Sequence, residues 1–130
     1  PGTRRGAALT ELRPAARPGT GTVCLVRAPG TPLSALTRVA YAYRGPEAVV
    51  LLRPPPYADA SAADAVVGAL TDLGGPLVLG AFCGGGERAH ALAGQLVAAG
   101  SRPPGVVLTG TATPAGAFAH TLEAVVRRIR

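Results

Sequence analysis

The sequence predicts an α/β domain in which helices flank a parallel β-sheet. Four short apolar runs have the length and composition of strands buried on both faces of such a sheet, at residues 22–26, 47–52, 76–79 and 106–109. Segments with apolar residues at helical spacing follow these strands. Short loops rich in glycine and proline join the elements, which is typical of strand–helix–strand units with right-handed crossovers.

Length and composition limit the possible functions. A chain of 130 residues has room for one domain and one core. With 48% hydrophobic but only 4% aromatic residues, that core is expected to consist of Val, Leu and Ala. The formal net charge of +6 favours an acidic partner. The basic residues, all arginine, are mostly scattered and have no aromatic residues between them, which argues against nucleic acid as a partner.

Location and redox state are predicted from what the chain lacks and from its cysteines. No apolar run is long enough to span a membrane and no secretory segment is present, so we expect no membrane partner. Cys24 and Cys83 show no metal-ligand spacing, which predicts a reducing, cytoplasmic location. A disulfide between them is an open alternative, since both could lie on neighbouring parallel strands.

The first 21 residues are rich in Pro, Gly, Arg and Ala and contain one short apolar pair, Leu9 and Leu12. This composition predicts a linker over residues 1–21 that leads into a domain at residues 22–130.

Helical spacing recurs after each predicted strand. Helices are expected over residues 33–43, 61–73, 87–99 and 115–130. Ser61 is a candidate N-cap of the second helix, and Gly100 is a candidate glycine C-cap of the third. The last helix is amphipathic and has a basic end.

The strand at 76–79 runs into a glycine cluster around one cysteine, Ala81-Phe82-Cys83-Gly84-Gly85, and a helix follows at once. A strand that turns sharply into a helix with a nucleophile at the turn is a nucleophile elbow. The small residues Ala81 and Gly85 would let strand and helix pass closely. The helix N-terminus would favour a thiolate at Cys83. Because the usual pattern is G-x-S-x-G, the residues alone leave a second interpretation, a glycine-rich turn with a buried cysteine.

A longer pattern surrounds this turn. It comprises Val78–Gly86, the Ala-His-Ala-Leu-Ala run at 89–93, residues 96–100 and 104–108, and upstream Val23–Gly30 with its Pro-Gly ending. Over residues 20–115 the pattern resembles the thioesterases that release products from polyketide and nonribosomal peptide assembly lines. The resemblance implies part of an α/β-hydrolase sheet. It also implies a small-molecule acyl chain as substrate, presented on the phosphopantetheine of an acyl or peptidyl carrier protein, and no cofactor bound by this domain.

The resemblance assigns roles to residues at the elbow and in the loop after the first strand. Cys83 takes the place of the serine nucleophile that forms the acyl-enzyme. The backbone amides of Gly84 and Thr31 are expected to form the oxyanion hole. Gly30 and Phe82 are expected to contribute to oxyanion or substrate binding.

The loops at the expected entrance follow the family in part. Residues 53–57 correspond to a Pro-Gly-containing loop that the family has beside the substrate entrance. After the first strand, family members often have further glycines, whereas Thr31-Pro32 is stiffer and Pro32 has no N–H donor.

The triad acid and base of the family are missing from their usual places. Thr109 stands where the family has an aspartate, and the family's histidine comes far downstream. His120 is the candidate base, provided that the C-terminal segment folds across the elbow. His90, in the elbow helix, is expected to be structural and to point toward the sheet or a neighbouring helix.

Three functions are compatible with these residues. The first is release of an acyl, polyketide or peptidyl chain from a carrier-protein thioester through a Cys83 acyl-enzyme, to water or to an amine. The second is a catalytically incomplete module that binds a carrier domain or an acyl chain without turnover. The third, an unrelated domain with a phosphate-binding turn, is disfavoured because the chain has no lysine to complete a P-loop.

Overall fold

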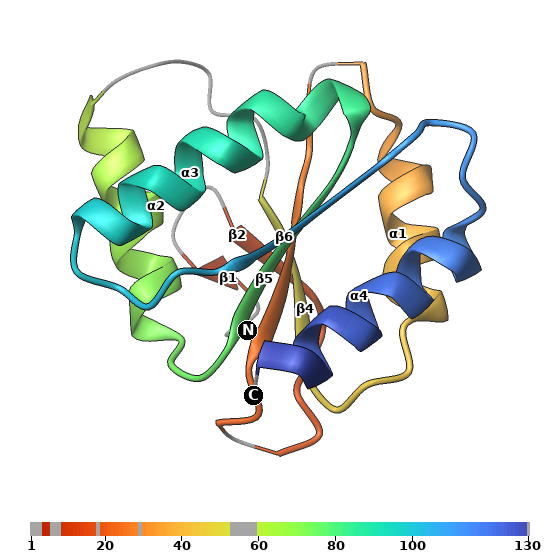
Figure 1. Ribbon diagram of the computed structural model, residues 1–130, viewed down its shortest axis with the longest axis horizontal. Helices are drawn as coiled ribbons and strands as arrows, with labels where there is room; N and C mark the ends of the chain where they lie inside the picture. The colour runs from red at the N-terminus through yellow and green to blue at the C-terminus, as the bar shows by residue number, and fades with distance from the viewer. Residues whose placement is uncertain (1–3, 6–8, 18, 29, 53–59, 130) are drawn as a thin grey trace.

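The computed structural model describes residues 4–5, 9–17, 19–28, 30–52 and 60–129, of which residues 4–5, 60–64 and Cys83 are described through their backbone. In this part of the chain one six-stranded sheet has the order β1-β2-β4-β3-β5-β6 (Figure 1). The strands are β1 (Arg4–Arg5), β2 (Leu9–Arg13), β3 (Thr22–Val26), β4 (Ala48–Leu52), β5 (Leu77–Phe82) and β6 (Gly105–Thr109). The helices are α1 (Leu33–Ala42), α2 (Ala60–Asp72), α3 (Gly86–Ala98) and α4 (Ala115–Ile129), with a 3-10 turn, η1 (Cys83–Gly85), directly before α3.

The sheet confirms the predicted α/β fold class. β4, β3, β5 and β6 run parallel to one another, and Val23 of β3 lies opposite Val49 on one side and Val78 on the other. These strands are the four predicted apolar runs, and β3 and β4 are buried along their whole length. Helices cover both faces of the sheet, which explains why the strands are continuously apolar rather than alternating.

Each face of the sheet has its own core. Figure 1 shows α1 and α4 on one face of the sheet and α2 and α3 on the other. Side chains alternate along β3, so that Val23 and Leu25 belong to the core between the sheet and α1 and α4, whereas Cys24 and Val26 belong to the core between the sheet and α2 and α3. Leu and Val side chains from the helices complete both cores, as predicted from the composition. Within the described ranges, no helix has both the length and the apolar composition needed to cross a membrane.

The N-terminal segment differs from the prediction. Residues 9–13 form β2, which pairs antiparallel with β4, so the linker prediction for residues 1–21 is wrong for this strand. Leu9 is fully buried in the α2–α3 core, whereas Leu12 packs against the α1–α4 core. Two apolar residues on opposite faces do not produce the alternation by which a half-buried strand is recognised in a sequence.

A buried carboxylate closes the amino-terminal end of β4. Glu47 is 1% exposed and accepts a hydrogen bond from the Tyr43 hydroxyl at 2.5 Å. Burial and this carboxylate raise the pKa of Tyr43 well above its usual range. Gly45 lies against the pair, since a Cβ there would meet a carboxylate oxygen of Glu47 and the Tyr43 hydroxyl. Nothing in the sequence pattern predicts this pair, because Glu47 stands at the start of an apolar run.

Candidate active site at the carboxyl end of the sheet

The elbow forms where the sequence predicts it. β5 passes into α3 through a single turn of chain, Cys83–Gly85. A Cβ at Gly85 would lie 3.0 Å from the Val26 carbonyl oxygen and 3.2 Å from the Ala81 Cβ, which confirms that small residues let strand and helix pass closely. The first turn of a helix leaves backbone N–H groups without intrahelical partners. The Gly84 amide therefore lies at the positive end of the helix dipole.

A pocket of about 440 Å³ opens beside the elbow. Its lining comes from the loop after β3, from α1, from the elbow and from the loop after β6: Gly30, Thr31, Pro32, Ala35, Phe82, Gly84 and Thr111. The structure thus brings together Gly30, Thr31, Phe82 and Gly84, the residues predicted for oxyanion or substrate binding. The pocket lies at the carboxyl ends of the parallel strands, which is where α/β sheets bind their ligands. The lining residues that the structure describes are all uncharged, which suits a neutral group.

Phe82 forms a fixed wall of this pocket. Its side chain is 6% exposed and meets the Phe118 ring edge-on, with 5.1 Å between ring centroids and 66° between ring planes. Phe118 belongs to α4 and is itself 1% exposed within the α1–α4 core. An edge-to-face aromatic pair in a packed core restricts both rings. The last helix therefore stabilises the end of β5 directly before Cys83.

The loop after β3 differs from the prediction in one hydrogen bond. The Thr31 amide donates to the Ala28 carbonyl oxygen at 3.0 Å and closes a tight turn. Gly30, inside this turn, has φ +91°, a conformation that glycine adopts without strain. An amide that is already bonded within the loop is not free to donate to an oxyanion. The structure therefore does not support Thr31 as an oxyanion donor.

Two arginines that no sequence pattern singles out lie next to this loop. The Arg27 Nε donates to the Thr31 carbonyl oxygen at 3.0 Å, and the Arg88 Nη1 donates to the Arg27 carbonyl oxygen at 2.9 Å. Both side chains are half-buried. Their positions in the sequence were the signal that could have identified them. Arg27 stands between a buried strand and a Pro-Gly loop, and Arg88 stands in the first turn of the elbow helix.

The expected position of the triad acid holds a pair of threonine hydroxyls. Thr109 ends β6 in register with Phe82, so it lies beside the elbow as predicted from the sequence. Its hydroxyl donates to the Thr113 hydroxyl oxygen at 2.7 Å. None of the described residues that line the pocket is His, Asp or Glu, and the described ranges contain no cluster of such residues that could hold a metal ion. The predicted entrance loop at 53–57 lies outside the described residues.

The structure does not bring His120 to the elbow. Its side chain is 77% exposed, and its Nδ1 lies 4.0 Å from Oε1 of Glu123 on the same helix. Because α4 buries Phe118 against the sheet, a residue two positions later lies on the opposite side of the helix. His90 is exposed as well, so the prediction that it points toward the sheet or a neighbouring helix is wrong. α3 buries Ala89 there instead.

Cys24 is a free thiol that is shielded from solvent. It is fully buried, and burial raises the pKa of the thiol to about 12. Cys24 lies opposite Leu79 of β5, and four residues of strand place Cys83 about 13 Å further along. Because bridged cysteines have Cα atoms within about 7 Å of each other, the alternative of a Cys24–Cys83 disulfide is excluded. Cys24 is therefore a built-in reference thiol for any experiment on Cys83.

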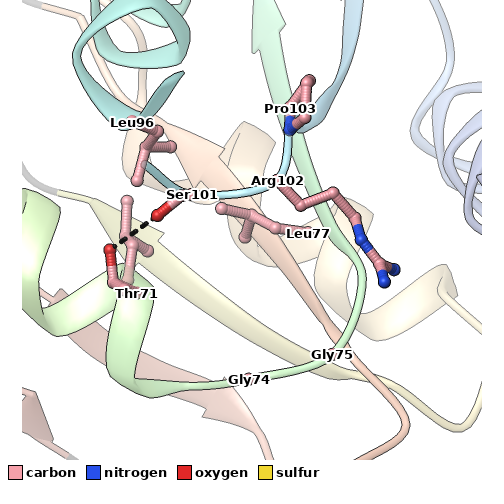
Figure 2. Close-up of a pocket in the computed structure, with 9 residues that line it drawn as sticks. Thr71, Gly74, Gly75, Leu77, Leu96, Ser101, Arg102 and Pro103 are labelled. Atoms are coloured by element: carbon pink, nitrogen blue, oxygen red, sulfur yellow. Dashed lines mark hydrogen bonds between the residues drawn. The ribbon is translucent and has the colours of Figure 1, made fainter. Parts of the chain in front are cut away.

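A smaller pocket of about 170 Å³ lies at the other end of the parallel strands, where β5 and β6 begin. It is bounded by the end of α2 and the stretch before β6, with Leu77 at the start of β5 (Figure 2). The hydroxyl oxygens of Thr71 and Ser101 are 3.0 Å apart in its wall, and the Arg102 side chain extends away from them (Figure 2). No residue predicted for the active site lines this pocket.

Comparisons with solved structures find the same fold in thioesterases and in a nonribosomal peptide synthetase. The Vlm2 thioesterase domain, solved with a bound dodecadepsipeptide, is 25% identical with a TM-score of 0.59. YbtT, the type II thioesterase from the yersiniabactin NRPS/PKS pathway, is 20% identical with a TM-score of 0.62. AB3403, a four-domain nonribosomal peptide synthetase, is 21% identical with a TM-score of 0.62. No protein-family model matches the chain, and no curated protein matches its sequence.

These matches extend over most of this chain but over less than half of the proteins compared. The Vlm2 match covers 78% of this chain and 44% of the Vlm2 chain, and the YbtT match covers 80% of this chain and 47% of YbtT. The AB3403 match covers 78% of this chain and 8% of AB3403. The chain therefore spans about half the length of the thioesterases that it matches. The predicted α/β-hydrolase-like fold is confirmed, and its structural neighbours include thioesterase domains.

Proposed function

We propose that this chain is an acyl-transfer domain of the thioesterase type. Cys83 takes an acyl, polyketide or peptidyl chain from the phosphopantetheine thioester of a carrier protein and holds it as an acyl-enzyme. The observation that carries this proposal is the 440 Å³ pocket, in which the elbow and the loop after β3 meet. The thioesterase structures with the same fold support the substrate class.

The proposed reaction has two steps. The Cys83 thiolate attacks the thioester carbonyl carbon, and the tetrahedral intermediate collapses by breaking the bond to the pantetheine sulfur, which leaves as a thiolate and takes up a proton. Water or an amine then attacks the new thioester on Cys83. This second step releases an acid or an amide and regenerates the Cys83 thiol after proton transfer.

The oxyanion donors are the point at which the structure changes the prediction. The Gly84 amide follows the nucleophile at the helix N-terminus and serves as one donor. In the loop after β3, Pro29 and Pro32 have no N–H group and the Thr31 amide is already bonded to Ala28. We therefore assign the second donor to the Gly30 amide, which belongs to a residue that lines the same pocket.

The chemistry of the lining predicts faster acylation than release. A thiol loses its proton more readily than a serine hydroxyl, and the N-terminus of α3 favours the thiolate. Hydrolysis of the acyl-enzyme needs a general base, and the described residues of the pocket supply none. Thr109 offers a hydroxyl in place of the expected carboxylate.

A second candidate function is a module that binds a carrier domain or an acyl chain without turnover. The missing base favours this function. The described lining of the pocket has no histidine or carboxylate, and His120 lies on the exposed side of α4. The two candidates differ in whether Cys83 becomes acylated at all.

Separate measurements of thiol and acid release distinguish these functions. The purified chain is mixed with an acyl-N-acetylcysteamine thioester, with Cys83→Ala as the matched control. The first function predicts one equivalent of thiol released quickly and carboxylic acid released more slowly, both abolished in the variant. Thiol release no faster than in Cys83→Ala would reject the acyl-enzyme and leave the binding module.

A further inference from the structure

Two hydrogen bonds connect the elbow helix to the loop on the other side of the pocket. Arg88, in the first turn of α3, donates from Nη1 to the Arg27 carbonyl oxygen at 2.9 Å. The Arg27 side chain continues the connection, since its Nε donates to the Thr31 carbonyl oxygen at 3.0 Å. The path therefore runs from α3, which directly follows the turn that carries Gly84, to the loop that carries Gly30.

The loop needs such a connection because its own hydrogen bond is local. The bond from the Thr31 amide to Ala28 fixes the shape of the turn, but both of its ends belong to the loop. It cannot fix the distance between the loop and the elbow. The Arg88 side chain can, because it reaches from a different element of the fold.

We infer that Arg27 and Arg88 are positioning residues that hold the Gly30–Thr31 turn at a fixed distance from Gly84. This inference rests on the proposed function, in which the two amides bind one oxyanion. Oxyanion donors act only when they lie about 2.7–3.1 Å from the developing charge, so a small displacement of the turn weakens one of them. Hydrogen bonds from charged donors are also stronger than neutral ones, which suits a guanidinium to this task.

The hydrogen bond from Arg27 to the Thr31 carbonyl oxygen also affects the charge around the site. A carbonyl oxygen carries partial negative charge and would repel an oxyanion that forms close to it. The bond to the Arg27 guanidinium keeps the Thr31 carbonyl oxygen paired and the turn in one orientation. The positioning therefore acts on acyl transfer, which forms an oxyanion, and not on reactions of Cys83 that form none.

The hydrogen bonds that the Arg27 and Arg88 side chains donate are called the arginine clamp. Amide hydrogen exchange tests this clamp without reference to activity. In Arg27→Gln and in Arg88→Gln, the Thr31 amide should exchange about tenfold faster than in the unmodified chain, because the turn opens more often. Arg102→Gln is the matched control. It removes the charge of another arginine, whose side chain is exposed at the other end of the parallel strands. Unchanged exchange of Thr31 in Arg27→Gln would overturn the inference whether or not Cys83 becomes acylated.

Two reagents then test what the clamp does for chemistry. Acylation by a thioester passes through an oxyanion, whereas alkylation by iodoacetamide does not. Arg27→Gln should acylate Cys83 at least about tenfold more slowly while its alkylation rate stays within about threefold of the unmodified chain. Arg27→Lys, which keeps the charge and one donor, should recover most of the acylation rate.

The outcomes separate this inference from the proposed function. If both rates fall equally in Arg27→Gln, Arg27 acts on the thiolate and the inference is overturned. The inference also fails if the variant acylates Cys83 as fast as the unmodified chain does. If the unmodified chain does not acylate, the proposed function fails and the clamp has no catalytic role, while the exchange of Thr31 still decides whether the clamp exists.

Discussion

Replacement of Gly85 by alanine tests the central packing contact of the elbow. A Cβ at this position would lie 3.0 Å from the Val26 carbonyl oxygen and 3.2 Å from the Ala81 Cβ. Ordinary contacts of a Cβ lie at 3.4–4 Å, so α3 must move away from the sheet by a few tenths of an ångström. Val26 is in the central part of the sheet between β4 and β5 and cannot yield easily.

The magnitude follows from overpacking. Extra methyl groups in a packed contact cost about 1–3 kcal/mol, and the lower backbone entropy of alanine in the unfolded chain returns about 0.4–1 kcal/mol. Gly85 has φ −100°, which alanine adopts freely, so the cost is steric. We expect Gly85→Ala to lower the free energy of unfolding by about 1–2 kcal/mol, and the melting temperature by about 4–7 °C.

Gly94→Ala is the matched control for this experiment. Gly94 lies in the same helix, and a Cβ there would meet nothing within 4 Å. Alanine in an exposed helix interior is favoured by about 0.5–1 kcal/mol over glycine, so this variant should melt above the unmodified chain. Thermal unfolding followed by circular dichroism measures both. A Gly85→Ala variant as stable as Gly94→Ala would refute the close passage of α3 over the sheet.

Three further predictions concern other parts of the structure. Because the folded pKa of Cys24 is raised from 9.0 to about 12, the unfolded chain loses this proton first as pH rises, so Cys24 by itself should lower the free energy of unfolding by about 1.4 kcal/mol per pH unit between pH 9 and 12. Urea unfolding at several pH values measures this slope, and an equal slope in Cys24→Val would contradict it. His120→Ala should leave the lifetime of the Cys83 acyl-enzyme within about twofold, since its side chain is 77% exposed; a much longer lifetime by intact mass would restore His120 as the base. Gly45→Ala should lower the free energy of unfolding by about 1–3 kcal/mol, because its Cβ would collide with Glu47. Gly68→Ala, with open space around its Cβ, should not be destabilised, and equal urea midpoints for the two variants would disprove the collision.

The fold was predictable because its strongest signals are local. Continuous apolar runs flanked by glycine and proline mark β3 and β4, and the glycine cluster after β5 marks the elbow. β2 was not predictable in the same way, since Leu9 and Leu12 pack on opposite faces of the sheet. The signal of a strand at the antiparallel side of a sheet depends on its neighbours more than on its own pattern.

The site was predictable in its location and less so in its hydrogen bonds. The elbow and the loop after β3 had to meet because parallel strands end at the same edge, and the structure places Gly30 and Gly84 around one pocket. The pairing of the Thr31 amide depends on the turn conformation, and the contacts of Arg27 and Arg88 depend on side-chain reach across the fold. Residue types and spacing carry neither kind of information.

The most direct test of the proposed function is to map which cysteine an acyl thioester modifies. The folded chain is exposed briefly to an acyl-N-acetylcysteamine thioester, digested, and analysed by mass spectrometry. We predict a rapid adduct on Cys83 and none on Cys24, because the thiol of Cys24 is fully buried with a pKa raised to about 12. The absence of an adduct on Cys83 in a folded chain, or equal modification of both cysteines, would contradict an elbow nucleophile at this site.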